Sequence, residues 1–229
     1  DLGEVWSPGL VFANAGVAAR PTLPEVVHVD ADGTVRYSQR WVGTFLQPLR
    51  LRDFPFDRQT LRLHLVSPTN RASEVELVAD ETWTATGLKD AVGLAAELSL
   101  PDWRILDWRA GPASYELTPR MQAAGYEVEL AVSRASRYYV LKVLLPLLLI
   151  VLMSWSVFWL DPAKSTGIQI GVSTTSMLTL IAYRFTIDTH VPRVPYLTRL
   201  DAFVLVSTVL VFLTLVVTVV TARLHLKGQ

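Results

Sequence analysis

Two long runs without a charged residue constrain this chain more than any other feature of its sequence. Residues 143–160 and 203–222 contain no Asp, Glu, Lys or Arg. Each run is close to the ~20 residues that a helix needs to cross a hydrocarbon core of ~30 Å. The sequence therefore predicts a membrane protein with the chain crossing the bilayer more than once.

Aromatic residues bracket the first of these runs. Tyr138 and Tyr139 stand at one end, and Trp155 and Trp159 stand at the other. The two pairs are separated by roughly 16 to 20 residues, which is ~24 to 30 Å of helix. This is the separation expected of aromatic belts at the two interfaces of a membrane. Pro146, inside the run, removes one backbone hydrogen bond, which neighbouring helices in a membrane can compensate.

The N-terminal part has a different period. In TLRLHLV, residues 60–66, apolar side chains alternate with Arg62 and His64, which is typical of a half-buried strand. Asp32-Gly33, between VVHV and TVRY, predicts a tight hairpin because Gly accepts positive φ. The stretch VDADG also resembles half of a calcium loop, but the ligands expected further on are missing.

These periods predict two domains. Residues 1–137 are expected to form a β-sandwich of short strands, since the chain has no βαβ spacing and no Gly-rich phosphate loop. Residues 138–229 are expected to form a membrane domain with helices at about 138–160, 167–187 and 201–224.

Composition excludes several functions. The chain has 21 Lys plus Arg against 21 Asp plus Glu, so net charge does not support a nucleic-acid partner. It has no cysteine, which excludes disulfides, thiol nucleophiles and Cys-ligated metals. The four histidines are scattered, and neither HExxH nor GxSxG is present. We therefore expect no enzyme, no metal site and no cofactor.

The segment QIGVSTTSMLTLIAYRF, residues 169–185, is apolar but rich in hydroxyls. At about 100° per residue, six positions with alternating spacings of four and three fall along one stripe. They are Gly171, Thr175, Leu178, Ala182, Phe185 and Thr189. Around an oligomer axis, Gly171 and Thr175 would form a narrow polar passage, and Leu178 and Phe185 would form hydrophobic rings that gate by dewetting. The same spacing also suits ordinary packing of membrane helices, and periodicity alone does not separate the two readings.

Motifs outside this segment favour the pore. FPFDRQT, residues 54–60, resembles the signature loop of the pentameric ligand-gated ion channels, the Cys-loop receptor superfamily. Gln47 and Leu61 stand where animal members carry the two cysteines, so the chain resembles the bacterial branch. Other segments resemble family motifs in the same chain order: VWSPGLVFANA, SRASRYYVLKVLLP, SWSVFWL, IGVSTTSMLTL and HVPRVPYLT. SWSVFWL and the position of Phe185 resemble the amine-activated bacterial channel ELIC.

The resemblance implies five identical subunits around a central pore, with an extracellular or periplasmic immunoglobulin-like β-sandwich above a multi-pass helical bundle in the cell membrane. It also implies that gating passes through a junction in which Arg134 pairs with Asp57. The junction residues are Phe54, Pro55, Phe56, Asp57, Arg134, Pro192, Pro195 and Tyr196. Relatives begin with more strands and end with a fourth membrane helix, so a chain truncated at both ends is expected, with three helices present.

The family binds agonist between subunits, in a box of aromatic side chains that suits cationic amines. Two walls of that box fall here on Ala13 and Pro68, so an amine agonist is not favoured, and a proton or another small molecule stays open. The candidate ligand-site residues are Phe12, Pro68, Tyr115 and Tyr126. Tyr126 also fits a core position of its strand.

Ion selectivity rests on few charges. Gly167 and Ile168 occupy the inner mouth, where cation-selective relatives place a glutamate, while Asp161 and Lys164 just beyond have opposite signs. Asp188, near the outer mouth, favours cations in a ring of five, so permeant cations are weakly favoured. The alternative function is a membrane-tethered β-sandwich that binds or signals without conducting, in which the stripe only packs against other helices.

Overall fold

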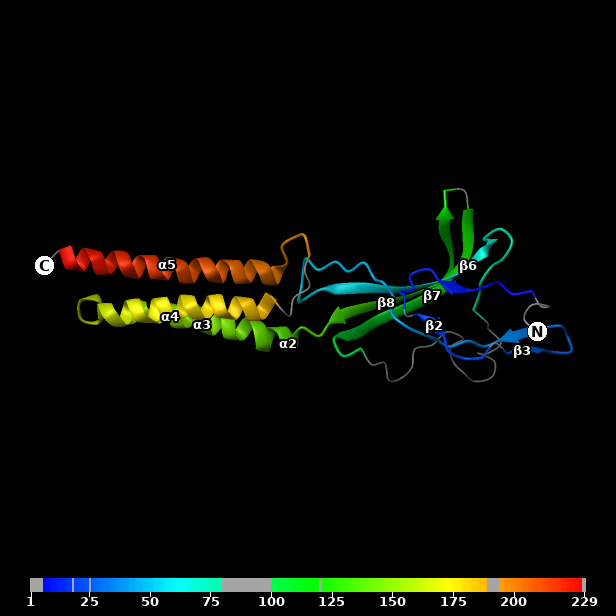
Figure 1. Cartoon of the computed structure of the whole chain (residues 1–229), viewed down its shortest axis with the longest axis horizontal. Coiled ribbons are helices and arrows are strands. Elements are labelled where there is room, and N and C mark those ends of the chain that lie inside the picture. The colour runs from blue at the N-terminus through cyan, green and yellow to red at the C-terminus, as the bar shows by residue number, and fades with distance from the viewer. Residues whose placement is uncertain are drawn as a thin grey trace. The chain divides into compact units, whose positions relative to one another are not determined.

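The computed structural model describes residues 6–17, 19–24, 26–79, 100–119, 121–188 and 194–227 (Figure 1). The chain divides into two compact units. The sheet unit comprises residues 1–49 and 58–133, and the helix unit comprises residues 50–57 and 134–229. The domain boundary predicted at residue 137 places residues 50–57 in the β-sandwich domain. They join the helices because their contacts are with the start of the first and the last helix.

The main sheet of the sheet unit has four strands in the order β1-β6-β8-β7. They are β1 (Val11–Phe12), β6 (Arg58–Arg71), β7 (Trp103–Thr118) and β8 (Met121–Arg134). β6 and β8 pair antiparallel over most of their lengths, from Arg58 opposite Ser133 to Ser67 opposite Ala124. Side chains of β-branched and apolar residues on these strands, such as Val66 and Val132, are buried, as the alternating pattern predicts.

Two small sheets complete this unit. β2 (Arg20–Pro21) pairs with β5 (Trp41–Val42), and β3 (Val27–Val29) pairs with β4 (Val35–Tyr37). The second pair is the hairpin predicted at Asp32-Gly33. Gly33 has φ of +87°, which L-residues with a side chain rarely adopt, and the backbone N–H of Thr34 donates to Asp32 Oδ1 over 2.9 Å.

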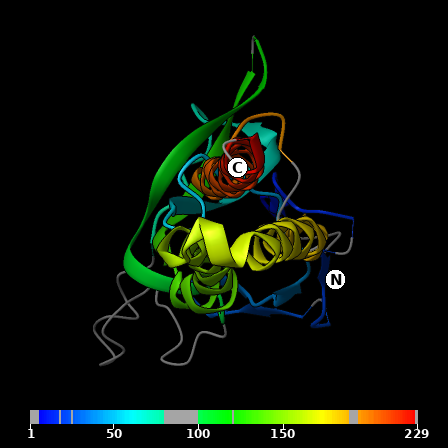
Figure 2. The ribbon, with the colours of Figure 1, turned by 90° about the vertical axis from the view of Figure 1, so that its left-hand side faces the viewer.

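The helix unit contains three rods that run side by side (Figures 1 and 2). The first joins α2 (Arg137–Tyr139), the π-helix η2 (Val140–Leu144), α3 (Leu145–Trp155) and the 3₁₀-helix η3 (Ser156–Trp159). The others are α4 (Pro162–Asp188), which kinks at Ser165, and α5 (Arg199–Lys227). Viewed end-on in Figure 2, the three rods occupy the corners of a triangle.

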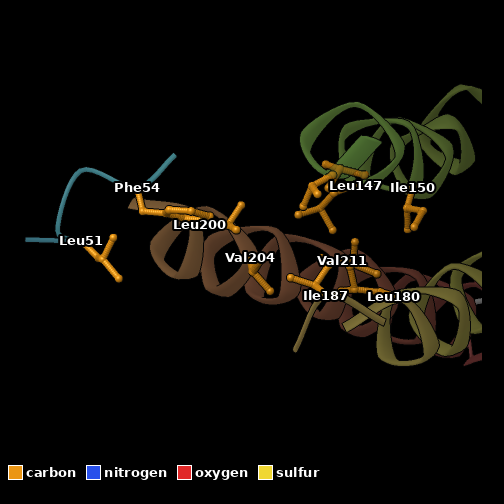
Figure 3. Packing of buried hydrophobic residues seen from close by; sticks show 11 residues of the cluster. Leu51, Phe54, Leu147, Ile150, Leu180, Ile187, Leu200, Val204 and Val211 are labelled. Atoms are coloured by element: carbon orange, nitrogen blue, oxygen red, sulfur yellow. The ribbon is translucent and has the colours of Figure 1, made fainter. Parts of the chain in front are cut away.

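Among the residues with a described structure, two helices are long and apolar enough to cross a membrane: Arg137–Trp159 and Arg199–His225. α4 is as long but carries more polar and hydroxyl side chains, which lower its hydropathy. The core of the helix unit joins all three rods to the loop of residues 50–57 (Figure 3). A sheet-rich unit followed by helices with two apolar spans confirms the predicted fold class of a β-sandwich with a membrane helical domain.

Candidate pore face and gating junction

One stripe of α4 is buried against the other two helical rods. Its members recur with helical spacing: Gln169, Ser173, Ser176, Leu180 and Ile187. Leu180 and Ile187 pack in the hydrophobic core with Leu147 of α3 and Val211 of α5 (Figure 3). Gln169 Nε2 donates to the carbonyls of Val157 and Leu160, over 3.0 and 2.9 Å, at the end of the first rod. This stripe therefore attaches α4 to its own subunit.

The predicted pore stripe lies on the other side of α4. Each member from Gly171 to Phe185 is two residues before or after a buried position, which is roughly 200° around the helix. Gly171, Thr175, Leu178, Ala182 and Phe185 are all exposed. The two large apolar side chains among them, Leu178 and Phe185, are 63% and 71% exposed. Within the described part of the chain, the other helices thus leave this face of α4 uncovered. Thr189 lies outside the described residues.

The hydroxyl-rich run divides between the two faces. Ser173 Oγ lies 3.2 Å from Thr218 Oγ1 of α5, in the buried interior of the helix unit. Ser176 Oγ donates to the carbonyl of Val172 over 2.8 Å. Both serines therefore lie on the buried side of α4, whereas Thr175 presents its side chain on the exposed face.

A buried ion pair forms the centre of the junction inside the helix unit. Arg134 Nε donates to Asp57 Oδ1 over 2.7 Å, and Arg134 Nη2 donates to Asp57 Oδ2 over 3.1 Å. The side chains of Arg134 and Asp57 are only 8% and 1% exposed. This bidentate geometry is the strongest form of the contact, since both guanidinium N–H groups meet a carboxylate oxygen. The ion pair expected from the sequence is therefore present.

Phe54 connects this pair to the helices. Its side chain is 1% exposed, and its ring centroid lies 4.8 Å from that of Tyr139 in an edge-to-face contact. The Arg134 guanidinium lies over the same ring, 4.9 Å from its centroid. The backbone N–H of Leu200, at the start of α5, donates to the carbonyl of Phe54 over 3.2 Å, and the two side chains lie next to each other in Figure 3.

Residues 50–53 belong to the junction as well, which the sequence analysis missed. The Tyr196 hydroxyl accepts from the backbone N–H of Leu51 over 3.0 Å. Arg199 donates its backbone N–H to the carbonyl of Arg52 over 2.9 Å, and its Nε lies 2.8 Å from Asp53 Oδ1. No local pattern relates Asp53 to Arg199. The only signal in this region is the T-x-x-D capping box of Thr198 and Asp201, which marks where α5 begins.

The predicted junction residues separate into groups. Phe54, Pro55 and Asp57 are buried, the side chain of Arg134 is 8% exposed, and Tyr196 contacts the same loop. By contrast, the side chains of Phe56 and Pro195 are exposed, and Pro192 lies outside the described residues.

Gln47 closes the signature loop by hydrogen bonds. Its Nε2 donates to the carbonyl of Arg62 over 2.6 Å, and its Oε1 accepts from the backbone N–H of Arg62 over 2.9 Å. Gln47 is one of the two positions at which animal relatives were expected to carry cysteine. Two side-chain bonds to one backbone residue therefore tie the ends of the loop together here without a covalent link.

The four ligand-site candidates do not form one cluster. Phe12 packs edge-to-face against Trp41 and Phe45, with ring centroids 5.5 and 5.1 Å away. Phe12 and Tyr126 both pair with Leu65 in the register of the sheet, on either side of β6. Tyr115 instead lies 5.8 Å from the ring of His64, the neighbour of Leu65. Because successive side chains of a strand point to opposite faces, Tyr115 and the pair of Phe12 and Tyr126 lie on different faces. Pro68 is half-buried near the end of β6.

Ion pairs link the acidic side chains of β8 to basic side chains of the neighbouring strands. Arg62 Nε lies 2.7 Å from Glu129 Oε1 and 3.2 Å from Glu127 Oε1, and His64 Nδ1 lies 3.5 Å from Glu127 Oε2. Arg109 Nε of β7 donates to the second oxygen of Glu129. This hydrogen bond from Arg109, with charge from Arg62, lowers the pKa of Glu129 below its ordinary value despite the burial of the carboxylate.

Comparison with known families agrees with both units. Residues 1–135 match the family described as the neurotransmitter-gated ion-channel ligand binding domain, and residues 143–229 match the neurotransmitter-gated ion-channel transmembrane region. The chain belongs to this family, the pentameric ligand-gated ion channels. It is a membrane protein, its residues 1–135 correspond to the family's extracellular ligand-binding domain, and its family consists of channels and not of enzymes.

Two relatives are similar to this chain over nearly its whole length. A "Proton-gated ion channel" of Gloeobacter violaceus is 27% identical over 227 residues, which cover 98% of this chain and 60% of the relative. A "Gamma-aminobutyric acid receptor subunit beta-like" of Drosophila melanogaster is 26% identical over 223 residues, which cover 94% of this chain and 42% of the relative. The chain therefore spans about half the length of the curated relatives it matches.

Proposed function

We propose that this chain is a subunit of a homopentameric ligand-gated channel that conducts ions passively across the cell membrane. In this proposal α4 lines the pore with the six residues of the predicted stripe, Thr189 included. The observation that carries it is the division of α4 into two opposite faces. One face is buried on the same subunit, while the other exposes Leu178 and Phe185 and is hydroxylated at Thr175.

The exposed face favours a pore over lipid contact or packing alone. A lipid-facing helix gains nothing from a glycine and a hydroxyl at the positions of Gly171 and Thr175, and α4 is also less apolar than the two other rods. In a ring of five, Leu178 and Phe185 close the path by excluding water, and the threonine ring offers oxygens to a partly hydrated ion.

A weak preference for cations forms part of the proposal. It rests on Asp188, the last residue of α4, which would place five carboxylates near one mouth of the pore. At the other end of α4, Lys164 and Asp161 supply charges of opposite sign.

Gating in this proposal acts through the junction around Phe54. The loop of residues 50–57 contacts both Tyr139, at the start of the first helical rod, and Leu200, at the start of α5. Motion of this loop would therefore reach two helices of the bundle at once. A ligand shifts such a junction when it binds one of two arrangements better. The two relatives are described as proton-gated and as a γ-aminobutyric acid receptor subunit, so protons and γ-aminobutyric acid are the first stimuli to apply.

Voltage-clamp recording tests the proposal. The complete gene product is expressed in a cell membrane and exposed to pH steps, γ-aminobutyric acid and a panel of amines, with wild type compared with Leu178→Ser. Stimulus-dependent currents whose gating changes in Leu178→Ser are expected, because a hydroxyl in the narrow ring weakens dewetting. A matched control is Leu205→Ser, an exposed leucine of α5. Silence from a protein shown to be pentameric at the surface would favour the tethered, non-conducting module.

A further inference from the structure

The first helical rod carries a break in its backbone hydrogen bonds near its outer end. Pro146 has no N–H, so it cannot donate to the carbonyl of Lys142, four residues earlier. The residues just before it form the π-helix η2, in which the N–H of Leu145 bonds to the carbonyl of Val140, five residues earlier. A free carbonyl is costly within a membrane, where water is scarce, and side chains of neighbouring helices commonly satisfy it.

A side chain of α4 meets this break. The Tyr183 hydroxyl lies 2.8 Å from the carbonyl oxygen of Lys142 and 3.1 Å from that of Val143. Tyr183 is half-buried and lies between Leu180 and Ile187, so it continues the buried stripe of α4. Its hydroxyl therefore donates to the carbonyl that Pro146 leaves without an α-helical donor.

We infer that Tyr183 is a positioning residue for the pore: its hydroxyl replaces the hydrogen bond that Pro146 cannot make and thereby holds α4 against the first helical rod. The inference rests on the proposed function. Tyr183 lies one residue from Ala182 and two from Phe185 on α4. A rotation or tilt of α4 that moves Leu178 or Phe185 must therefore change the two distances from the Tyr183 hydroxyl, and the bond biases the equilibrium between closed and open pores.

The first test removes only the hydroxyl. Tyr183→Phe is compared with Tyr138→Phe, the same substitution at a tyrosine whose hydroxyl makes no hydrogen bond within the described part of the chain. From the worth of one neutral hydrogen bond, Tyr183→Phe should shift the stimulus concentration for half-maximal current about threefold to tenfold. Unitary conductance and the number of channels at the surface should stay at wild-type values. Equal effects of Tyr183→Phe and Tyr138→Phe would overturn the inference.

The second test is a double-mutant cycle with Pro146→Ala. Alanine returns an N–H at residue 146, so the carbonyl of Lys142 regains a backbone donor and the Tyr183 hydroxyl becomes dispensable. In the Pro146→Ala background, Tyr183→Phe should therefore shift the half-maximal concentration less than about twofold. Independent, additive effects of the two substitutions would overturn the inference.

Failure of the channel proposal would look different. If wild type at the surface carries no current, the proposed function fails, and the positioning role in gating fails with it. The same double-mutant cycle, measured as the melting temperature of the detergent-solubilised pentamer, still tests whether the Tyr183 hydroxyl replaces the hydrogen bond that Pro146 cannot make. Tyr183→Phe should then destabilise the wild-type background more than the Pro146→Ala background, and additivity would refute the replacement.

Discussion

Removing the carboxylate of the buried junction is the sharpest test of how the helix unit is held together. Asp57→Asn preserves the size of the side chain but leaves the Arg134 guanidinium, 8% exposed, without its bidentate partner. Breaking a buried pair in this way costs about 3 to 5 kcal/mol because the desolvated guanidinium loses the carboxylate charge that it faces. At 1.4 kcal/mol for each factor of ten, the folded arrangement loses roughly two to three and a half powers of ten in its equilibrium constant.

The same loop supplies the control. Asp53 pairs with Arg199 over 2.8 Å, but the two side chains are 58% and 68% exposed. An exposed pair is worth about 0.2 to 1 kcal/mol because water screens it. Asp53→Asn should therefore leave stability near that of wild type. The assay heats detergent-solubilised protein and measures the surviving oligomer by fluorescence-detected size-exclusion chromatography. Melting temperatures that fall equally in the two variants would refute the reasoning from burial.

Two further predictions concern the sheet unit and α5. In the folded protein, the Arg109 hydrogen bond lowers the pKa of Glu129. The charge of Glu129 therefore stabilises the fold fully above about pH 4.3, the ordinary pKa of a glutamate. This stabilisation is lost as the pH falls through the lower pKa that Glu129 has in the folded protein. Melting curves against pH should show Glu129→Gln with a flatter acid limb than wild type; an unchanged limb would contradict this. Thr198→Ala removes the N-cap of α5 and should cost about 0.5 to 2 kcal/mol, seen as faster hydrogen exchange in the first turn of α5. Thr208→Ala, inside α5, should leave that turn unchanged.

The elements of the fold could be predicted where the pattern is local. The apolar runs predict two of the helices because crossing a membrane requires a continuous length of apolar side chains. The Asp32-Gly33 hairpin follows from one residue that tolerates positive φ. Helix ends differ from the expected ones by a few residues at α4 and α5, because capping and the contacts of the last turns decide them.

The candidate site was accessible from the sequence only in part. The two faces of α4 follow from a period of 3.6 residues, so the positions of Leu178 and Phe185 on an exposed stripe were predictable. The partners of residues 50–53 were not, because Asp53 and Arg199 are far apart in sequence and each is an ordinary exposed charge. The arrangement of the ligand-site candidates could not be predicted either. Tyr115 and Tyr126 lie on opposite faces of a sheet, which depends on how the strands pair and not on the presence of aromatic residues.

The sequence by itself therefore determined the membrane spans, the alternating strands, the stripe of α4 and, through ordered motifs, the family. These are properties of neighbouring residues, for which period and composition suffice. Only the tertiary structure decided that residues 50–57 belong with the helices, that Arg109 covers Glu129, and that Tyr183 bonds to the backbone beside Pro146. Each of these depends on groups distant in the chain meeting within hydrogen-bonding distance, and no local pattern of residues encodes that distance.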